Sequence, residues 1–474
     1  MKYVQVNSVP HGSTGSIMMG LHGKLLDEGV DSYVCWGRGR SAENGRELKF
    51  GADLGFYGDV LRTRFDGRAG FHSRGATRRL LAWLDEIDPD VVHLHNIHGY
   101  YVNIEMLFEW LASHRCRVKW TLHDCWAFTG HCAHFTYAKC AQWQSHCAHE
   151  KPCPQLGTYP KTYSRRSCAR NFEDKRRLFN LVPPERMELI TPSKWLADLV
   201  GQSFLSKYSV TVKHNEIDLS VFKPTPSDFR ERYGIGDRFM ILGVASPWTE
   251  RKGLGDFVRL AGELDEHYVI VLVGLNKRQI KRLPKQIIGL QRMGDPERLA
   301  EAYTAADIFV NPSIEETFGM TVAEAAACGT PVAVCADSAC MEASEDADRR
   351  VVAADLSNLF ATVVRAGGGC LVMMIERTSR KDQLAAIYTS ADIFFNPTRE
   401  DNYPTVNLEA QACGTPVMTY DVGGCRETVA AFSSCNSDNR LRNVVILNAG
   451  SDAVRSFAKK LAGIKIDIEG RRHG

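Results

Sequence analysis

Short apolar runs alternate with helical stretches from the start of the chain. Strands are predicted at KYVQVNSV, SYVCWG, DVVHLH and RVKWTLHD, which are rich in β-branched and aromatic residues. Apolar residues recur at helical spacing in SIMMGLHGKLLDEG, ATRRLLAWLDEI and NIEMLFEWLASH. Continuous apolar strands separated by helices are typical of a parallel sheet that is covered on both faces. The pattern therefore predicts an α/β fold.

The alternation stops at residues 125–170, which are rich in Cys, His, Trp, Lys and Arg. Long loops of this kind inside compact domains are usually functional. The pattern restarts at MELITPSKWLADLV, passes a polar stretch, PTPSDFRERYG, and continues through RFMILGVAS, YVIVLVG, ADIFVNP and PVAVC. We expect one Rossmann-like domain over residues 1–210, a second over 211–365, and a further segment over 366–474.

That last segment contains a repeat. The stretch AYTAADIFVNPSIEETFGMTVAEAAACGTPV recurs 85 residues later as IYTSADIFFNPTREDNYPTVNLEAQACGTPV. The similarity runs from about residues 290–342 to 375–427. Because solenoids need about three or more repeats, we interpret the second copy as a partial duplication of one strand-helix-strand unit, followed by a tail.

Composition narrows the class of protein. At 474 residues the chain is too long for one ordinary domain, and 44% hydrophobic with 24% charged residues suits a globular protein. A formal charge of +2 gives no indication of nucleic-acid binding. The first residues indicate a strand rather than a signal peptide, and no run approaches the ~20 apolar residues of a membrane span. We expect a cytoplasmic protein whose fifteen Cys are thiols or metal ligands.

Candidate chemistry in the first half lies where predicted strands end. Gly12 and Gly15 form a strand-to-helix turn at which backbone amides can approach a phosphate, although a plain tight turn is an equal alternative. His95 follows the strand DVVHL, and His123 follows RVKWTL. Ligands of doubly wound sheets bind at the carboxyl ends of strands. Both histidines are therefore expected to line a cleft.

The second half offers cations and carboxylates. Arg251 and Lys252 open a helix after FMILGVAS, which suits a diphosphate. Glu316 precedes the next helix, Gly319 allows a close approach at its start, and Glu324 lies about two turns inside it. Two carboxylates on one side of a helix N-terminus predict hydrogen bonds to the hydroxyls of a sugar nucleotide.

The Cys-rich loop has two interpretations. Reduced thiols are the default interpretation, because the spacings lack the short C-x2-C knuckles of strong zinc motifs. Structural zinc is the alternative, on four ligands that fall within 22 residues, namely Cys132, Cys140, Cys147 and Cys153. Trp126, in the same loop, either stacks on an acceptor sugar or packs in the core.

Taken together, these residues resemble retaining glycosyltransferases of family four. The resemblance covers about residues 1–345 and is strongest to bacterial capsule, exopolysaccharide and lipopolysaccharide sugar transferases. It is carried by the Gly12–Gly15 loop, DVVHLHNIHG, TLHDCWAFTGHC, TPSKWLADLV, the ERKG turn and the pair of glutamates with seven residues between them. It implies a GT-B fold with two Rossmann-like domains and a hexosyltransferase-type enzyme. The acceptor would lie on the first domain and the nucleotide-sugar on the second.

The resemblance also implies roles. Arg251 and Lys252 would hold the donor diphosphate, Glu316 the transferred sugar and Glu324 the ribose. His123 would lie beside the anomeric carbon, with His95 and Trp126 on the acceptor side. No cofactor would be required beyond a UDP- or GDP-sugar substrate. The partners would be that donor and a saccharide or lipid-linked acceptor, with peripheral contact at the inner face of the membrane also open and no nucleic acid.

Some positions depart from the family pattern. Ser246 stands where many relatives carry an Arg, and Glu216 stands where Gly is usual. The second copy of the repeat offers another donor element, with Asp401 and Glu409 in the two acidic positions; we favour the first copy. Two alternatives to a working transferase stay open. One is an impaired nucleotide-sugar-binding protein, and the other is a different GT-B enzyme such as an epimerase.

Overall fold

The computed structural model describes residues 1–353, apart from positions 43, 336–337 and 346–349. Beyond them it describes residues 381–391, 394–396, 403–415, 417–420, 424–425, 427–428 and 445–447. The chain divides into two compact units, Met1–Met374 and Ile375–Gly474. Among the described residues, none of the helices combines the length and apolarity needed to cross a bilayer.

The first sheet of the first unit has the strand order β3-β2-β1-β4-β5-β6-β7, and its neighbouring strands run parallel. Its strands are β1 (Lys2–Asn7), β2 (Asp31–Trp36), β3 (Glu47–Lys49), β4 (Val91–Leu94), β5 (Arg117–Thr121), β6 (Met187–Thr191) and β7 (Ser209–Val212). The connecting helices are α1 (Gly12–Asp27), α2 (Asp53–Asp66), α3 (Arg74–Ile87), α4 (Ile104–Ser113), α5 (Ser167–Leu178) and α6 (Lys194–Gly201).

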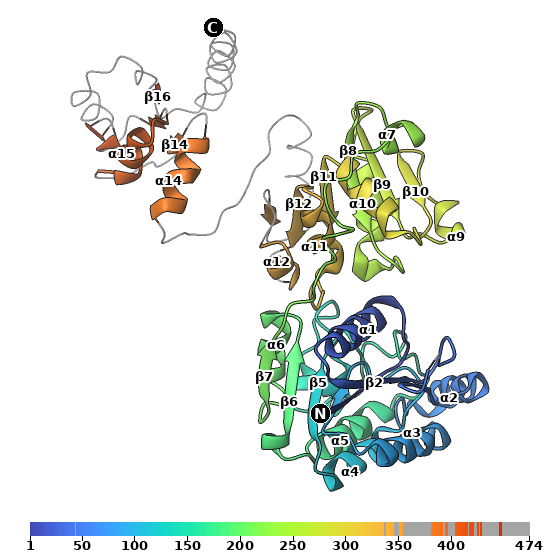
Figure 1. Ribbon diagram of the computed structural model, residues 1–474. Coiled ribbons are helices and arrows are strands. Elements are labelled where there is room, and N and C mark those ends of the chain that lie inside the picture. Colours follow the sequence, from blue (N-terminus) through green and yellow to red (C-terminus); the bar gives the residue numbers. More distant parts are fainter. Residues whose placement is uncertain are drawn as a thin grey trace. The chain divides into compact units, whose positions relative to one another are not determined.

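Helices cover both faces of this sheet because strand side chains alternate between the faces. Val34 and Trp36 of β2 pack against Met18 of α1. On the opposite face, Val4 of β1 joins the large core to which α3, α4 and α5 contribute, for example through Leu84. Figure 1 shows α1 on one side of the sheet and α3, α4 and α5 on the other.

The second sheet has the order β10-β9-β8-β11-β12-β13 and is also parallel. Its strands are β8 (Phe239–Val244), β9 (Tyr268–Val273), β10 (Ile287–Leu290), β11 (Ile308–Asn311), β12 (Val332–Cys335) and β13 (Arg350–Ala353). Its helices are α7 (Phe229–Arg232), α8 (Leu254–Ala261), α9 (Lys277–Ile280), α10 (Pro296–Ala305), α11 (Met320–Ala327) and α12 (Cys340–Ala343). Leu242 packs toward α10 and α11, and its neighbour Ile241 packs toward Phe257 of α8 on the other face. The doubly wound parallel sheets predicted from the sequence are confirmed.

The second unit contains a parallel sheet of order β14-β15-β16, with strands Phe394–Asn396, Val417–Tyr420 and Val445–Leu447 and helices α14 (Lys381–Ser390) and α15 (Thr405–Ala412). Its elements repeat α10, β11, α11 and β12 of the first unit. The hydroxyl of Tyr303 donates to Glu324 at 2.9 Å, and that of Tyr388, 85 positions later, donates to Glu409 at 3.3 Å. The duplicated sequence thus forms the same local structure twice.

The bounds of the two sheets in the first unit do not test the domain limits expected at residues 210 and 365. The first sheet ends at Val212 and the second begins at Phe239. Those limits stay predictions.

Candidate active site

Two histidines meet at the carboxyl edge of the first sheet. His95 directly follows β4 and His123 follows β5, and their rings lie 5.6 Å apart with His95 Nδ1 at 3.3 Å from His123 Nε2. Gln5 Oε1 lies 3.1 Å from His95 Nε2. Since an amide oxygen only accepts, Nε2 donates to Gln5 and Nδ1 accepts from His123.

Burial lowers the pKa of both rings. It lowers the pKa of His123 to about 4, although the neighbouring Asp124 raises it, and it takes the pKa of His95 well below its ordinary value. At neutral pH both imidazoles are therefore uncharged. A neutral imidazole at His123 can form hydrogen bonds with a ligand without repelling a cationic centre.

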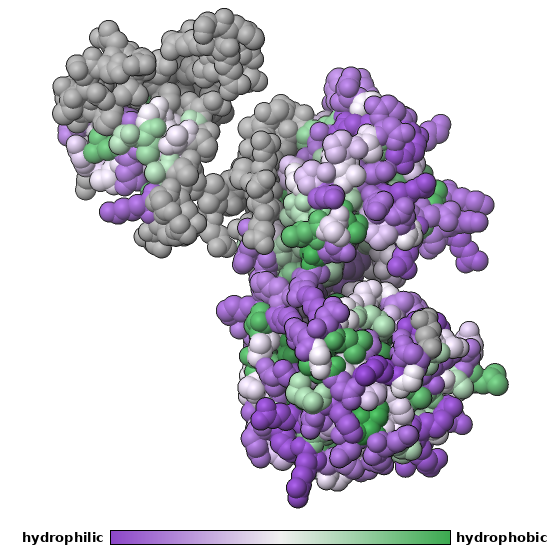
Figure 2. All heavy atoms as spheres, viewed as in Figure 1, coloured by the Kyte–Doolittle hydropathy of each residue, from purple (hydrophilic) through white to green (hydrophobic). Residues whose placement is uncertain are grey.

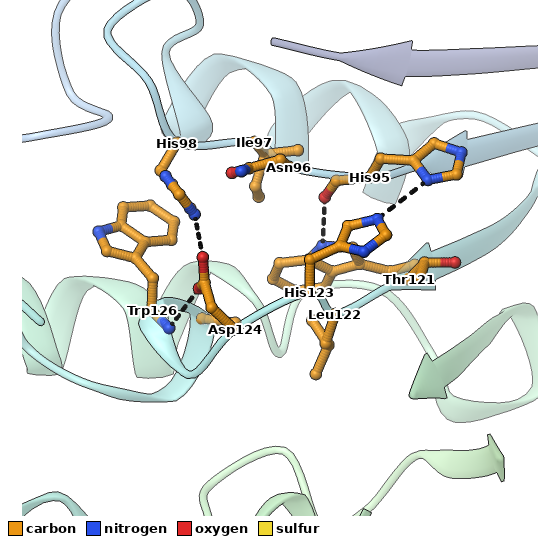
Figure 3. Close-up of a pocket in the computed structure, with 11 residues that line it drawn as sticks. His95, Asn96, Ile97, His98, Thr121, Leu122, His123, Asp124 and Trp126 are labelled. Atoms are coloured by element: carbon orange, nitrogen blue, oxygen red, sulfur yellow. Dashed lines mark hydrogen bonds and ion pairs between the residues drawn. The ribbon is translucent and has the colours of Figure 1, made fainter. Parts of the chain in front are cut away.

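A second pair, which the sequence did not single out, lies beside these histidines. His98 Nε2 lies 2.7 Å from Asp124 Oδ2, and the other oxygen of Asp124 accepts from the backbone N–H of Trp126 at 2.9 Å. Burial would raise the pKa of Asp124, but the charge and hydrogen bond of His98 lower it to about 2. Figure 3 shows this pair and the His95–His123 pair around a recess of about 10 Å³, roughly the space of one water molecule.

Gly12 and Gly15, predicted in a strand-to-helix turn, lie in the first turn of α1, after the loop that follows β1. Gly12 has φ of 72°, a conformation that glycine adopts easily. A Cβ at Gly15 would lie only 2.6 Å from the carbonyl carbon of Pro10. The two glycines are thus required for different reasons, one by conformation and one by space. Their contact with a donor phosphate stays a prediction.

The cationic turn after β8 meets the acidic turn after β11. Lys252 lies in the short 3-10 helix Glu250–Lys252 and forms an ion pair with Glu316. Arg251 donates to the backbone oxygen of Glu315. Burial would raise the pKa of Glu316, but the charges of Lys252 and Arg251 hold it below its ordinary value. The residues predicted to bind the diphosphate and the residue predicted to bind the sugar therefore lie side by side.

The second predicted carboxylate, Glu324, lies within α11. Gly319 precedes α11 with φ of 95°, and a Cβ there would lie 2.9 Å from Cys340 Sγ. Glu324 accepts from the hydroxyl of Tyr303, a side chain that is fully buried. Burial raises the pKa of Glu324 to about 7 even though this hydrogen bond lowers it. Glu324 is thus poised between its two protonation states at neutral pH.

The acidic turn also contacts the first sheet's domain. The hydroxyl of Thr317 donates to the backbone oxygen of His123 at 2.9 Å. The fully buried carboxylate of Glu315 accepts from the backbone N–H groups of Phe135 at 2.8 Å and Tyr137 at 2.9 Å. These bonds place the turn of Glu316 against His123. No sequence pattern pointed to Glu315, because its partners lie about 180 positions away.

Glu342 makes a similar contact at the other side of this interface. Its carboxylate accepts from the backbone N–H groups of Lys194 at 2.6 Å and Trp195 at 2.9 Å, at the start of α6. A carboxylate is favourable at a helix N-terminus, where amide groups lack helical partners. Glu216, which stands where the family pattern has Gly, forms an exposed ion pair with Lys24 of α1.

Trp126 is buried, with 1% of its surface exposed. The ammonium of Lys175 lies 3.3 Å from the centre of its ring and donates to its backbone oxygen at 2.8 Å. This placement fits packing in the core, the alternative that the sequence left open. The proposed stacking on an acceptor would need the indole to leave this environment.

The Cys-rich loop brings thiols together. Hydrogen bonds from Cys132 and from Cys168, a residue of α5, lower the pKa of Cys153, and the backbone N–H of Gly130 donates to Cys147 Sγ at 3.2 Å. In the part of the chain that the structure describes, no group of three or more His, Cys, Asp or Glu side chains is arranged to hold a metal ion. Zinc on Cys132, Cys140, Cys147 and Cys153 stays a prediction without structural support.

The alternative donor element is only partly described. Asp401 lies outside the described residues. Glu409 lies in α15 and accepts from Tyr388.

Comparison with solved structures defines the class of fold. Sucrose-phosphate synthase from Thermosynechococcus elongatus matches with a TM-score of 0.55 at 15% identity, covering 77% of this chain and 89% of that chain. The HepE protein of Anabaena, solved in complex with UDP and glucose, matches with a TM-score of 0.50 at 15% identity and the same coverage. The protein has the GT-B fold with two Rossmann-like domains.

Sequence comparison finds similarity to glycosyltransferases. Residues 238–367 and 367–439 each match a family model described as "Glycosyl transferases group 1". The alpha-galactosylglucosyldiacylglycerol synthase of Streptococcus pneumoniae (strain ATCC BAA-255 / R6) is 31% identical over 163 residues, which cover 31% of this chain and 43% of that protein. The putative colanic acid biosynthesis glycosyl transferase WcaC of Escherichia coli (strain K12) is 26% identical over 233 residues, covering 46% and 55%. The chain spans about half the length of these curated relatives.

Proposed function

We propose that this protein is a retaining glycosyltransferase that moves a hexose from a nucleotide-sugar to a saccharide or lipid-linked acceptor in bacterial polysaccharide or glycolipid synthesis. One observation carries the proposal. The Lys252–Glu316 pair joins a residue proposed to bind phosphate to one proposed to bind the sugar, and Glu316 lies in the turn whose Thr317 donates to the backbone of His123. The residues proposed to bind the two halves of a nucleotide-sugar thus face the carboxyl edge of the first sheet, which carries His123.

The residues divide the donor between them. Arg251 and Lys252 bind the diphosphate and stabilise the negative charge that grows on it as the sugar leaves. Glu316 accepts from hydroxyls of the transferred sugar, and Glu324 accepts from the ribose. The matches to the two glycosyltransferase family models and the UDP complex of HepE support a nucleoside diphosphate sugar as the donor.

Transfer with retention needs no protein nucleophile in this proposal. The acceptor hydroxyl attacks the anomeric carbon from the face that the diphosphate leaves, and the departing phosphate oxygen takes the hydroxyl proton. The neutral ring of His123 borders this centre and adds no positive charge to it. The names of the pneumococcal and E. coli relatives support a glycolipid or polysaccharide product.

The experiment measures nucleoside diphosphate release from a panel of UDP- and GDP-sugars, with and without saccharide and lipid-linked acceptors. Release that depends on an acceptor, with an α-linked product from an α-linked donor by NMR, supports the proposal. Glu316→Gln should lower kcat roughly 100- to 1,000-fold while binding of the free nucleotide changes little. Glu263→Gln, an exposed residue after α8, is the matched control and should retain full turnover.

The outcomes separate the alternatives. Donor binding without turnover would identify an impaired binding protein. Conversion of the donor without an acceptor would identify an epimerase. Full activity of Glu316→Gln would reject its role.

A further inference from the structure

The helix α2 presents an apolar stripe to solvent. Leu54, Tyr57, Leu61 and Phe65 follow one another at intervals of three or four residues, so they lie on one face. Their exposed fractions are 89%, 67%, 60% and 69%. The opposite face is buried through Asp59 and Thr63. A helix of a globular domain normally turns its apolar face to the core, so this stripe is oriented for something outside the domain.

The stripe continues onto a neighbouring loop. Tyr163 is 64% exposed, and its ring lies 6.3 Å from that of Phe65. Its backbone N–H donates to the backbone oxygen of Arg64 at 2.8 Å, which ties the loop to the end of α2. Figure 1 places α2 at the edge of its domain, and Figure 2 shows hydrophobic atoms projecting from that edge among hydrophilic ones.

Cations surround a cavity beside the stripe. The cavity has a volume of about 640 Å³ and is lined by α2, by the start of α3 and by the loop after β4. The exposed side chains of Arg62, Arg74 and Arg79 line it, as does Leu54 of the stripe. Its buried carboxylate, Asp59, already accepts from the hydroxyls of Ser73 at 2.6 Å and Thr63 at 3.2 Å. The cavity therefore has a cationic rim.

The charged residues around the stripe have partners on neighbouring segments. Asp53 lies 3.8 Å from Lys49, and Asp66 lies 3.1 Å from His72. Arg74 lies 3.9 Å from Glu105, so the positive charge of the rim is carried mainly by Arg62 and Arg79.

We propose that the α2 stripe and the arginines beside it bind an anionic lipid surface. The apolar side chains would enter the acyl boundary of the bilayer, and the guanidinium groups would contact phosphate headgroups. Helices with an apolar face and adjacent Arg residues bind lipid interfaces in this way. The proposal does not rest on the proposed transferase activity.

The charges favour a lipid surface over a second copy of this chain. A symmetric dimer would place each patch against itself, which would bring Arg62 and Arg79 of the two copies close together and oppose association. An anionic lipid surface complements the same charges.

The cavity lies at the same edge of the first sheet as the candidate active site. Gly37, directly after β2, and Gly51, shortly after β3, line it at the carboxyl edge of the sheet, the edge that also carries His95 and His123. A lipid-bound molecule held at this surface would lie on the same edge as the candidate active site.

The test is sedimentation of the full chain with vesicles. Vesicles of phosphatidylcholine with about one quarter phosphatidylglycerol should bind the protein, and phosphatidylcholine alone should bind it much less. The double variant Leu61→Glu, Phe65→Glu should reduce binding at least about tenfold. Arg62→Glu should reduce it roughly fivefold or more, an effect that weakens at high salt. Leu219→Glu, at an equally exposed leucine outside α2, is the control and should bind like the native chain.

Thermal unfolding checks that the variants fold, which is expected because all four substituted side chains are exposed. Failure of the native chain to bind anionic vesicles would overturn the proposal, as would equal binding by the α2 variants and the control. A native chain that dimerises without vesicles, and becomes monomeric in the Leu61→Glu, Phe65→Glu variant, would overturn it in favour of a second copy.

Discussion

The proposed role of Glu324 would make donor binding depend on pH. Its carboxylate accepts from the buried Tyr303, and burial raises its pKa to about 7. Ribose hydroxyls donate hydrogen bonds, and these are stronger to an ionised carboxylate than to a neutral one. We therefore predict that the protein binds a nucleotide-sugar more tightly as pH rises through 7, and that Glu324→Gln removes this dependence.

The magnitude follows from the fraction of protein that is competent to bind. With a pKa of about 7, roughly one tenth of Glu324 is ionised at pH 6 and roughly nine tenths at pH 8. If only the ionised form binds well, the apparent Kd is the intrinsic Kd divided by this fraction. The Kd should then fall roughly tenfold between pH 6 and pH 8. At pH 8, Glu324→Gln should weaken the binding free energy of the nucleotide-sugar by about 1.5 to 3 kcal/mol, the value of a hydrogen bond to a charged group.

Calorimetric titration with UDP-glucose, or with the donor that the screen identifies, measures this Kd at pH 6, 7 and 8. A nucleotide-sugar is preferred to the free diphosphate because both of its phosphates are esterified and neither titrates in this range. Glu409→Gln, the same change at the equivalent position of the second copy, is the control.

Several results would refute the reasoning. An unchanged Kd from pH 6 to pH 8, or the same change in Glu324→Gln, would show that this carboxylate is not the titrating ligand. Loss of the pH dependence in Glu409→Gln alone would mean that the second copy forms the donor site.

Stability provides an independent check on the same group. Because the pKa of Glu324 is raised from 4.5 to about 7, the folded state holds a proton that the unfolded chain has already released between these values. The free energy of unfolding should therefore fall as pH rises from 4.5 to 7, by up to about 3 kcal/mol. Urea titrations of the native chain and Glu324→Gln at pH 5 and pH 8 measure the difference, and a variant that is no more stable than the native chain at pH 8 would contradict it.

Three further predictions concern charged side chains. Arg251→Ala and Lys252→Ala should each weaken a nucleoside diphosphate but not the nucleoside, with a smaller loss at high salt; equal native affinities for both ligands would argue against the clamp. Glu315→Gln should cost about 1.5 to 3 kcal/mol in urea unfolding, because an amide cannot accept from both buried N–H groups as the carboxylate does; an unchanged midpoint would disprove the contact. Glu216→Gln should change the unfolding free energy by less than about 1 kcal/mol, since its pair with Lys24 is exposed; a larger loss would give the pair a structural role.

The two sheets could be predicted because their signal is local. In runs such as FMILGV and YVIVLV, successive side chains point to opposite faces of the sheet and are buried on both. The helices between these strands have a complementary apolar face. The positions of His95 and His123 could also be predicted, because residues that follow parallel strands share one edge of the sheet. The spacing of Glu316 and Glu324 was enough to assign them to one helix start, although Glu324 lies about one turn inside α11 and not the two turns predicted.

Contacts between distant segments could not be predicted. Glu315 and Glu316 are adjacent and chemically identical, yet Glu315 is fully buried against backbone N–H groups of the Cys-rich loop and Glu316 pairs with Lys252. Only the folded chain determines which of the two faces the loop. The burial of Trp126 against Lys175 could not be predicted for the same reason. The same local sequence allows an indole either to stack on a sugar or to pack in a core.

The repeat shows why a copied segment need not copy a site. The candidate donor site uses residues after two different strands, Arg251 and Lys252 after β8 and Glu316 after β11. The duplicated segment begins only at about residue 290, so it copies β11 and α11 without β8 and its cationic turn. The second copy can therefore form the same strand, helix and Tyr388–Glu409 bond, but by itself it brings no counterpart of the diphosphate clamp. A donor bound there would need cations from outside the repeat, and this is the physical reason to assign the donor to the first copy.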